Sequence, residues 1–223
     1  MGLQPFQQTD SFYIKRYQMK TALHEKSLVL VKPDGVQRGL IGEIITRFER
    51  KGLKIVAMKM VWPDKALAKK HYDMPESDKI ILGERTIASY EEKGVDLKKT
   101  PIEIAENVQK RLINYLTTGP VVAMVIEGAH AIAHVRKIRG ATNPLSADVG
   151  TITSDYTIDS YFLSDPDERA IRNLVHASGS VEEGKREVAL WFKDGEIHDY
   201  DLAIEKVLYS KDWESARKDL VEG

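Results

Sequence analysis

A short, strongly apolar run near the start of the chain sets the first structural constraint. Leu28-Val29-Leu30-Val31 is followed closely by Pro33-Asp34-Gly35. An apolar, β-branched run that ends in turn residues predicts a buried strand followed by a turn. The next segment repeats apolar residues every three or four positions, which predicts a helix with one buried face. These positions are Leu40, Ile41, Ile44, Ile45 and Phe48, and Gly52 is expected to stop the helix.

Strand and helix patterns continue along the rest of the chain. Short apolar segments predict three further strands, at residues 53–61, 121–126 and 172–178. Helical spacing, together with a capping Asp64 and a first-turn Pro101, predicts helices in the intervening segments. These helices are expected at residues 64–72, 101–117, 129–139 and 181–192.

Two polar stretches interrupt this order. Residues 73–100 are rich in Glu, Lys and Asp and indicate a solvated insertion with one helix, whereas residues 140–157 carry Gly, Pro and Thr and indicate a long loop. The remaining order is strand–helix–strand, helices, strand–helix–strand. It predicts an α+β fold with a ferredoxin-like, four-stranded antiparallel sheet and helices on one face.

Composition narrows the possible partners and compartments. The 223 residues include 33 basic and 34 acidic side chains, with a net charge of −1. No strong field therefore draws the whole molecule to nucleic acid or to anionic lipid. Cysteine is absent, which excludes disulfides and fits a cytoplasmic protein, and no apolar run approaches the roughly 20 residues that span a bilayer. Residues 1–25 lack the pattern of a secretory signal and are expected to be an N-terminal extension.

His176 is the strongest candidate for a reactive residue. It follows the apolar end of a predicted strand and precedes Ser178, Gly179 and Ser180, whose small side chains suit the edge of a pocket. A neutral imidazole is a fair nucleophile at pH 7, and covalent phosphoryl transfer needs such a group with its ring held in one orientation. Glu187, eleven residues later, could fix the ring by accepting a hydrogen bond from its second nitrogen. On spacing alone, a surface carboxylate is the commoner role for Glu187.

Three other polar residues could meet a phosphate. Lys32 stands at the end of the first predicted strand, where it is either an edge charge or an ammonium aimed at a ligand. Arg136 and Thr142 flank Gly140, at the end of a predicted helix. A guanidinium can hold phosphate oxygens with two parallel hydrogen bonds, and a hydroxyl can add one more.

Three further motifs are rejected. Residues 179–185 match the spacing of a Walker A loop, but Arg186 stands where a Ser or Thr should bind magnesium. His130 and His134 could share a helix face, yet no third ligand accompanies them, so no protein metal site is predicted. Residues 50–56 faintly match an RNA-recognition strand but have no aromatic residues to stack on bases.

Taken together, the ordered segments resemble the nucleoside diphosphate kinase family from about Lys26 to Tyr209. The two segments that carry most of the resemblance are residues 31–44, which contain Lys32-Pro33-Asp34-Gly35, and residues 173–178, which contain His176. The other matching pieces are His71-Tyr72, Gly119-Pro120-Val121-Val122-Ala123-Met124-Val125, Gly140-Ala141-Thr142-Asn143-Pro144, Gly150-Thr151-Ile152 and Trp191-Phe192.

The resemblance implies a ping-pong reaction through His176. A nucleoside triphosphate phosphorylates the histidine and leaves as the diphosphate, and a second diphosphate then takes the phosphoryl group. Mg²⁺ is implied as the cofactor, held mainly by the nucleotide, with broad base selectivity and a homo-oligomer, hexamer or tetramer. The implied catalytic residues are His176, Glu187, Lys32 and Ser178, and the implied nucleotide contacts are Lys32, Tyr72, Arg136, Thr142 and Asn173.

The chain departs from the family pattern in three ways. Thr153 follows Gly150-Thr151-Ile152 where the family carries a phosphate-gripping arginine, and Gly179 replaces an aspartate. Insertions interrupt the pattern near residues 74–105 and 157–170, within a domain expected to cover residues 26–223. Arg172, adjacent to Asn173, is the favoured substitute for the missing arginine, and Arg139 is the second choice.

Two rival functions follow from these departures and from the fold. The first is a weakened or inactive nucleotide-binding member of the same fold with a regulatory role, for which Thr153 is the only support. The second is a nucleic-acid-binding module, which the neutral charge and the lack of stacking aromatics disfavour.

Overall fold

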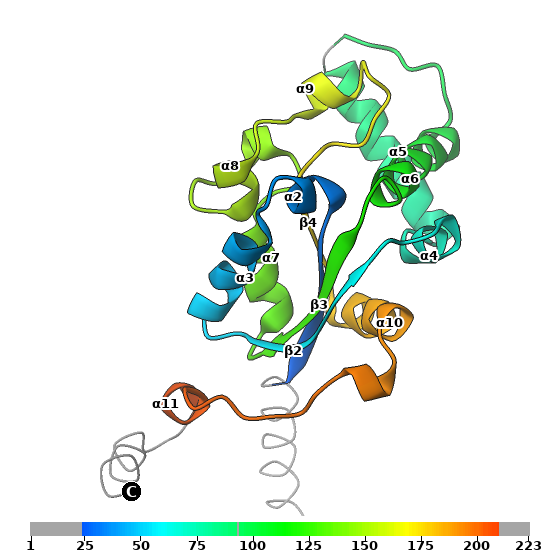
Figure 1. Cartoon of the computed structure of the whole chain (residues 1–223). Helices are drawn as coiled ribbons and strands as arrows, with labels where there is room; N and C mark the ends of the chain where they lie inside the picture. The colour runs from blue at the N-terminus through cyan, green and yellow to red at the C-terminus, as the bar shows by residue number, and fades with distance from the viewer. Residues whose placement is uncertain (1–23, 93, 210–223) are drawn as a thin grey trace, which may run out of the picture.

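Four strands form one antiparallel sheet that carries the rest of the structure. The computed structural model describes residues 24–92 and 94–209, so most of the predicted N-terminal extension lies outside the described residues. The strands are β1 (Glu25–Val31), β2 (Lys54–Val61), β3 (Val121–Gly128) and β4 (Val175–Ala177), and their spatial order is β2-β3-β1-β4 (Figure 1). The predicted α+β class, the four strands and their antiparallel pairing are all confirmed.

Helices cover both faces of the sheet, so the expectation of helices on one face was wrong. On one face lie α3 (Ile41–Arg50), α7 (Ala131–Arg139) and α8 (Ile152–Tyr156). On the other lie α4 (Lys65–His71), α6 (Pro101–Leu116) and α10 (Val181–Trp191) (Figure 1).

Strand β1 shows why both faces need a cover. Val29 and Val31 point into the core under α3 and α7, whereas Leu28 and Leu30 point into the core under α6 and α10. All four side chains are fully buried. Successive residues of a strand face opposite sides, so an uninterrupted apolar run requires a layer on each side.

Local sequence signals account for most helix ends. Asp64 caps α4 by accepting a hydrogen bond from the Leu67 amide at 2.7 Å, as predicted. Thr100 and Glu103 form a reciprocal capping box at the start of α6, where Pro101 occupies the first turn. Gly52, with a φ of +85°, follows the end of α3. A left-handed φ of this kind favours glycine and stops the helix.

Two segments predicted without helices contain short ones. Residues Pro33–Gln37, expected as a turn, form α2. The expected loop at 140–157 contains a 3-10 turn, η1 (Pro144–Ser146), and α8, whose first turn is capped by the Thr151 hydroxyl. Neither helix exceeds five residues, which is too short to produce the apolar repeat on which the prediction relied.

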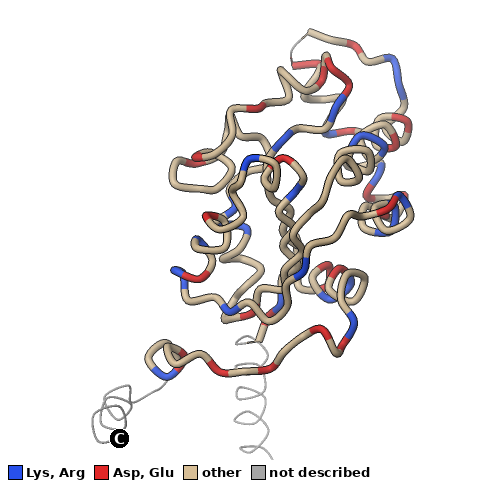
Figure 2. The backbone as a smooth tube through the Cα atoms, in the orientation of Figure 1, with Lys and Arg blue, Asp and Glu red and all other residues tan. Residues whose placement is uncertain are grey.

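The predicted insertions also have regular structure. The expected single helix within 73–100 is α5 (Glu76–Glu91), which packs against α6. The second insertion contains α9 (Tyr161–Ser164), and the chain continues after α10 through η2 (Asp194–Glu196) to α11 (Glu205–Tyr209). Among the described residues, no helix is long and apolar enough to cross a membrane. Acidic and basic residues are both spread over the fold, in keeping with the near-zero net charge (Figure 2).

A close helix–strand contact at Gly184 yields a stability prediction. A Cβ at this position of α10 would lie 2.5 Å from the carbonyl oxygen of Lys26 and 3.1 Å from Ile132 Cδ1. Gly184→Ala should therefore destabilise the fold by about 1–3 kcal/mol, although alanine is ordinarily the better helix former. Gly42→Ala in α3 is the matched control, because its Cβ would meet nothing within 4 Å, and it should be neutral or stabilising by up to about 1 kcal/mol.

The measurement is urea unfolding of both variants and the wild type, followed by far-UV circular dichroism. Equal stability of the two glycine variants would mean that α10 does not need its close approach to β1.

Candidate active site

Strand β4 directs His176 toward one helix. His176 pairs with Leu30 in the antiparallel register of β4 and β1, so both side chains face the side covered by α10. Its neighbours Val175 and Ala177 belong to the opposite core. Because successive side chains of a strand face opposite sides, the His176 ring points toward α10 while its two neighbours point into the other core.

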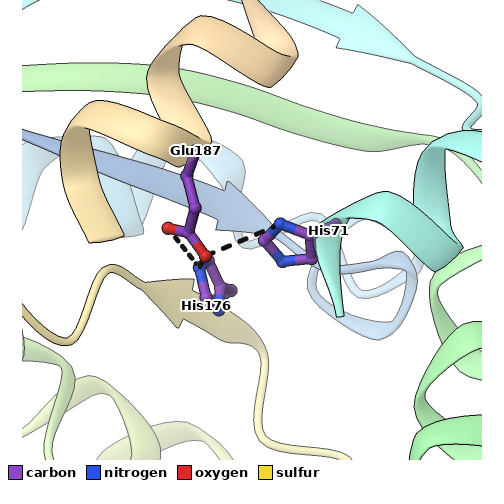
Figure 3. A group of neighbouring side chains, drawn as sticks. All are labelled: His71, His176 and Glu187. Carbon is purple, nitrogen blue, oxygen red and sulfur yellow. Dashed lines mark hydrogen bonds and ion pairs between the residues drawn. The ribbon is translucent and has the colours of Figure 1, made fainter. Parts of the chain in front are cut away.

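The His176 ring is held by a buried carboxylate on that helix. His176 Nε2 lies 3.0 Å from Glu187 Oε2 and 2.9 Å from Oε1 (Figure 3). The Ser178 hydroxyl donates a second hydrogen bond to Glu187 Oε2 at 2.7 Å and accepts one from the Leu28 amide at 3.0 Å. Glu187 is only 1% exposed. The predicted contact is present, and a chain of hydrogen bonds links it back to strand β1.

His71 completes the cluster, although the sequence analysis gave it no role. Its ring stands edge-on to that of His176, with centroids 4.4 Å apart, and its Nδ1 lies 3.6 Å from Glu187 Oε1 (Figure 3). The Trp191 indole N–H donates to His71 Nδ1 at 3.2 Å, so the ring proton of the neutral imidazole must be on Nε2. Its place beside Tyr72 in a matching segment was the one sequence signal for this residue.

The cluster is a poor metal site despite its composition. His71, His176 and Glu187 offer ligand atoms within 4.8 Å of one another. However, Trp191 occupies the lone pair of His71 Nδ1, and Glu187 already accepts from Ser178. A metal bound through His71 Nδ1 would have to displace the Trp191 hydrogen bond at a buried position, which is costly.

Electrostatics keep the His176 imidazole neutral. Burial, followed by the nearby positive charge of Lys32, lowers the pKa of His176 to about 3. Because a carboxylate accepts hydrogen bonds, the proton of the neutral ring is on Nε2, facing Glu187. Nδ1 then carries a free lone pair at neutral pH, which is the form that a nucleophile requires.

Lys32 is a buried cation on the far side of this cluster. Its Nζ donates to Asn173 Oδ1 at 2.6 Å, and Asn173 Nδ2 donates in turn to the Thr142 carbonyl at 2.8 Å. Burial lowers the pKa of Lys32 to about 8, with Asp34 opposing the shift and Arg139 adding to it. Three predicted nucleotide contacts, Lys32, Asn173 and Thr142, are thus joined in one chain of hydrogen bonds.

Tyr72 and Arg136 border the same region. Tyr72 follows α4, and burial raises the pKa of its phenol, whose oxygen has no hydrogen-bond partner among the described residues. Arg136 lies in the last turn of α7 and is exposed. A Cβ added to Gly179 would lie 3.4 Å from Arg136 Nη1, so this guanidinium reaches the segment just beyond His176.

A cavity of about 630 Å³ opens onto the reactive ring. It holds enough space for a small ligand, and its walls come from α4, the start of α5 and α10. The residues that line it nearest the histidine are His71, Tyr72, His176, Glu183, Arg186 and Glu187.

Thr153 and Arg172, the two residues linked to the missing arginine, do not line the cavity beside His176. Thr153 is 1% exposed, and its hydroxyl has no hydrogen-bond partner among the described residues. Arg172 is exposed and lines a separate cavity of about 540 Å³, together with Gln37, Arg38 and Tyr115. His176 does not line that cavity, and the substitution by Arg172 stays a prediction.

The fold and the site together have the features that a phosphotransferase needs. The structure has a neutral imidazole with one fixed nitrogen and one free nitrogen, close to a buried ammonium group. The chain belongs to the nucleoside diphosphate kinase family, because the family model described as nucleoside diphosphate kinase matches residues 25–82 and 103–197. The ferredoxin-like α+β fold is that of the family.

Individual relatives agree with this assignment. A nucleoside diphosphate kinase of Pyrococcus furiosus is 46% identical over 181 residues, which cover 81% of this chain and 91% of that protein. The crystal structure of an NDP kinase from Pyrobaculum aerophilum has a TM-score of 0.76 and 41% identity, and the match covers 79% of this chain and all of that one.

A second solved structure is a complex with a mimic of the transition state. A nucleoside-diphosphate kinase of Borrelia burgdorferi, solved as a transition-state mimic with vanadate and ADP, has a TM-score of 0.68 and 39% identity, with 82% of this chain and 95% of that chain covered. The chain is therefore an enzyme that transfers phosphoryl groups between nucleotides, and none of these comparisons favours an inactive, regulatory member.

The lowered pKa of Lys32 leads to a pH prediction. The ammonium can attract phosphate only while it is protonated, so kcat/KM for ATP should fall as the pH rises through about 8. The charged groups acting on it are Asp34 on α2, which favours the ammonium, and Arg139 at the end of α7, which disfavours it; the Tyr115 ring lies 5.4 Å away.

The measurement is kcat/KM between pH 6 and 10 for the wild type and for Lys32→Arg, whose guanidinium stays charged over this range. The variant should lose the alkaline fall even if its maximum rate is lower. A wild-type profile that stays flat to pH 10 would contradict the role of the ammonium.

Proposed function

We propose that His176 Nδ1 carries the phosphoryl group between the two half-reactions. The Nδ1 lone pair attacks the γ-phosphorus of a nucleoside triphosphate, and the bond from phosphorus to the bridging oxygen breaks, so the diphosphate leaves with that electron pair. A terminal oxygen of a second diphosphate then attacks the phosphohistidine and restores the free imidazole. The observation that carries this proposal is the fixed Nε2 contact with Glu187, which leaves Nδ1 free.

Glu187 and Ser178 position the ring and offset the charge that develops on it. Phosphorylation of Nδ1 makes the ring more cationic, and a carboxylate 3 Å away stabilises that charge. Ser178 fixes the carboxylate itself, since it donates to Glu187 while it accepts from the backbone of β1. Burial raises the pKa of Glu187, and its contacts with His71 and Ser178 oppose that shift.

The phosphates are expected to lie between the histidine and the cations. Lys32 and Arg136 attract the phosphate oxygens. The Tyr72 hydroxyl has no hydrogen-bond partner within residues 24–92 and 94–209 and can donate to one of them. Asn173 and Thr142 hold Lys32 and the adjacent loop in place through their hydrogen bonds.

Mg²⁺ fits this site as an ion brought by the nucleotide. The protein groups close to His176 include cations and a carboxylate, Glu187, that is already hydrogen-bonded, so they form no cage for the ion. Among the cavity-lining carboxylates, Glu183 accepts from the Gly179 amide, and Glu182 is exposed and accepts from Lys185 Nζ at 2.9 Å. When bound, Mg²⁺ neutralises part of the phosphate charge.

The assembly and location of the protein remain predictions. Met58 and Met60 on β2, an edge strand of the sheet, and Trp62 directly after it are each more than half exposed. Apolar side chains at an edge suit a homo-oligomer, hexamer or tetramer. The cytoplasmic location, the absence of specific nucleic-acid binding and the division at residue 25 stay expectations from sequence.

The phosphohistidine is tested by labelling the protein with γ-labelled ATP. The wild type should take up a label that is stable in base and labile in acid, and His176→Ala should take up none while it still binds ADP. His198→Ala is the matched control, because His198 is exposed and does not line the cavity. Near wild-type turnover by His176→Ala would exclude the mechanism.

The orienting role of Glu187 is tested by Glu187→Gln. The amide keeps the shape of the side chain but not its charge, so phosphorylation of His176 should slow by roughly 10–100-fold. The affinity for ADP, measured by titration calorimetry, should barely change. A variant that binds ADP far more weakly yet phosphorylates normally would show that Glu187 serves nucleotide binding instead.

A further inference from the structure

The site lacks one cation that its family places against the phosphates. Position 153 carries threonine, and this side chain is buried with an unpartnered hydroxyl. It can neither carry charge nor reach a ligand in the cavity beside His176. Phosphoryl transfer places negative charge on the transferred oxygens, so a missing cation should weaken the stabilisation of the transition state unless another residue supplies it.

Arg139 begins close to the place from which the missing side chain would extend. It is the last residue of α7, the helix whose previous turn carries Arg136. Gly140 follows with a φ of +92°, and a Cβ there would lie only 2.4 Å from Thr151 Oγ1. The end of α7 therefore lies in close contact with Thr151, the capping residue of α8, two positions before Thr153.

Arg139 is also a half-buried cation without a carboxylate partner. Its Nε donates to the Gly140 carbonyl at 3.1 Å, and among the described residues no carboxylate oxygen lies within 4.0 Å of its guanidinium. By contrast, Arg47, Arg111 and Arg169 are each paired with an aspartate. An unpaired, partly desolvated cation is costly, which indicates that the guanidinium meets an anion in the working enzyme.

The positive charge of Arg139 acts on both Lys32 and His176. It lowers the pKa of Lys32 and the pKa of His176, and burial together with Arg136 lowers its own pKa. Lys32, Arg136 and Arg139 therefore form a cationic group around the histidine. Neither Lys32 nor Arg136 has a carboxylate within 4.0 Å among the described residues.

Arg172, the substitute favoured from the sequence, faces another way. Burial alternates along this segment: Ile171 and Asn173 are buried and Arg172 is exposed between them. Asn173 accepts a hydrogen bond from Lys32, whereas Arg172 lines the separate cavity with Gln37. Adjacency in the sequence therefore does not bring Arg172 into the site.

We propose that Arg139 binds the phosphoryl group during its transfer to and from His176, in place of the arginine that the family carries at position 153. The inference rests on the proposed role of His176. Arg139 would hold phosphate oxygens through its free terminal nitrogens, while its Nε–Gly140 hydrogen bond fixes the plane of the guanidinium.

The test compares Arg139→Ala with Arg172→Ala, in the full chain, by single-turnover phosphorylation with γ-labelled ATP and by steady-state exchange. Arg139→Ala should reduce kcat/KM by at least about 10-fold, while Arg172→Ala should remain within about 2-fold. Arg139→Lys should fall between the wild type and Arg139→Ala, because it keeps the charge but loses bidentate binding. Thr153→Arg should restore part of the rate in the Arg139→Ala background.

A second readout separates phosphate binding from a structural effect. Vanadate, a mimic of the transferred group, should tighten ADP binding to the wild type, and Arg139→Ala should lose most of this gain while binding ADP alone almost normally. If Arg139→Ala does not fold, Arg139→Gln, which keeps much of the side chain without the charge, decides the question by the same measurements.

Two outcomes would overturn the proposal: full activity and full vanadate response in Arg139→Ala, or a large loss in Arg172→Ala alone. Failure of the proposed function gives a different result: the His176→Ala variant would still take up the label from γ-labelled ATP. The vanadate measurement does not depend on that label, so the two failures can be told apart.

Discussion

The buried carboxylate of Glu187 is the interaction on which the site depends. It accepts hydrogen bonds from His176 and Ser178, which belong to β4 and its continuation, while its own backbone belongs to α10. A carboxylate that is 1% exposed needs such donors to offset the loss of water. Three features must therefore agree to place this carboxylate. They are the register of β4, the Ser178 hydroxyl bonded to the Leu28 amide, and the close approach of α10 to β1 at Gly184. Because the sheet and the helix meet at this carboxylate, the fold determines which ring nitrogen stays free.

The second requirement is a set of cations without carboxylate partners. Lys32 is buried and Arg139 is half-buried, yet within the described part of the chain each has only uncharged oxygen atoms as hydrogen-bond acceptors. Burial lowers the pKa of both groups, while Arg139 adds to the shift at Lys32 and Arg136 to the shift at Arg139, so an anionic ligand would relieve unfavourable electrostatic energy. Active sites commonly trade stability for binding in this way. The apolar cores on the two faces of the sheet stabilise the fold and offset this unfavourable electrostatic energy.

Much of this structure could be predicted from sequence, and the failures have physical causes. Strands and long helices were predicted because their apolar periods are clear. The contact between His176 and Glu187 was predicted through the family resemblance, because spacing alone favoured a surface carboxylate. Short helices such as α2 and α8 were missed, since five residues show no period. Helices on both faces could have been inferred from the apolar run at Leu28–Val31, because a strand with one exposed face alternates. The role of His71 depends on a distant Trp191, and a pair this far apart leaves no local signal.

The choice between the two arginines shows where sequence reasoning ends. Arg172 adjoins a site residue, yet it is exposed and lines a separate cavity, while Asn173 is buried and bonded to Lys32. Arg139 is remote in sequence from Thr153, yet the tight contact of Gly140 with Thr151 brings their backbones together. A long side chain on the adjacent element can then supply a charge that its neighbour lacks, and a departure from a family motif need not mean a loss of activity. What the reaction requires is a cation at a point in space, and more than one backbone position can deliver it.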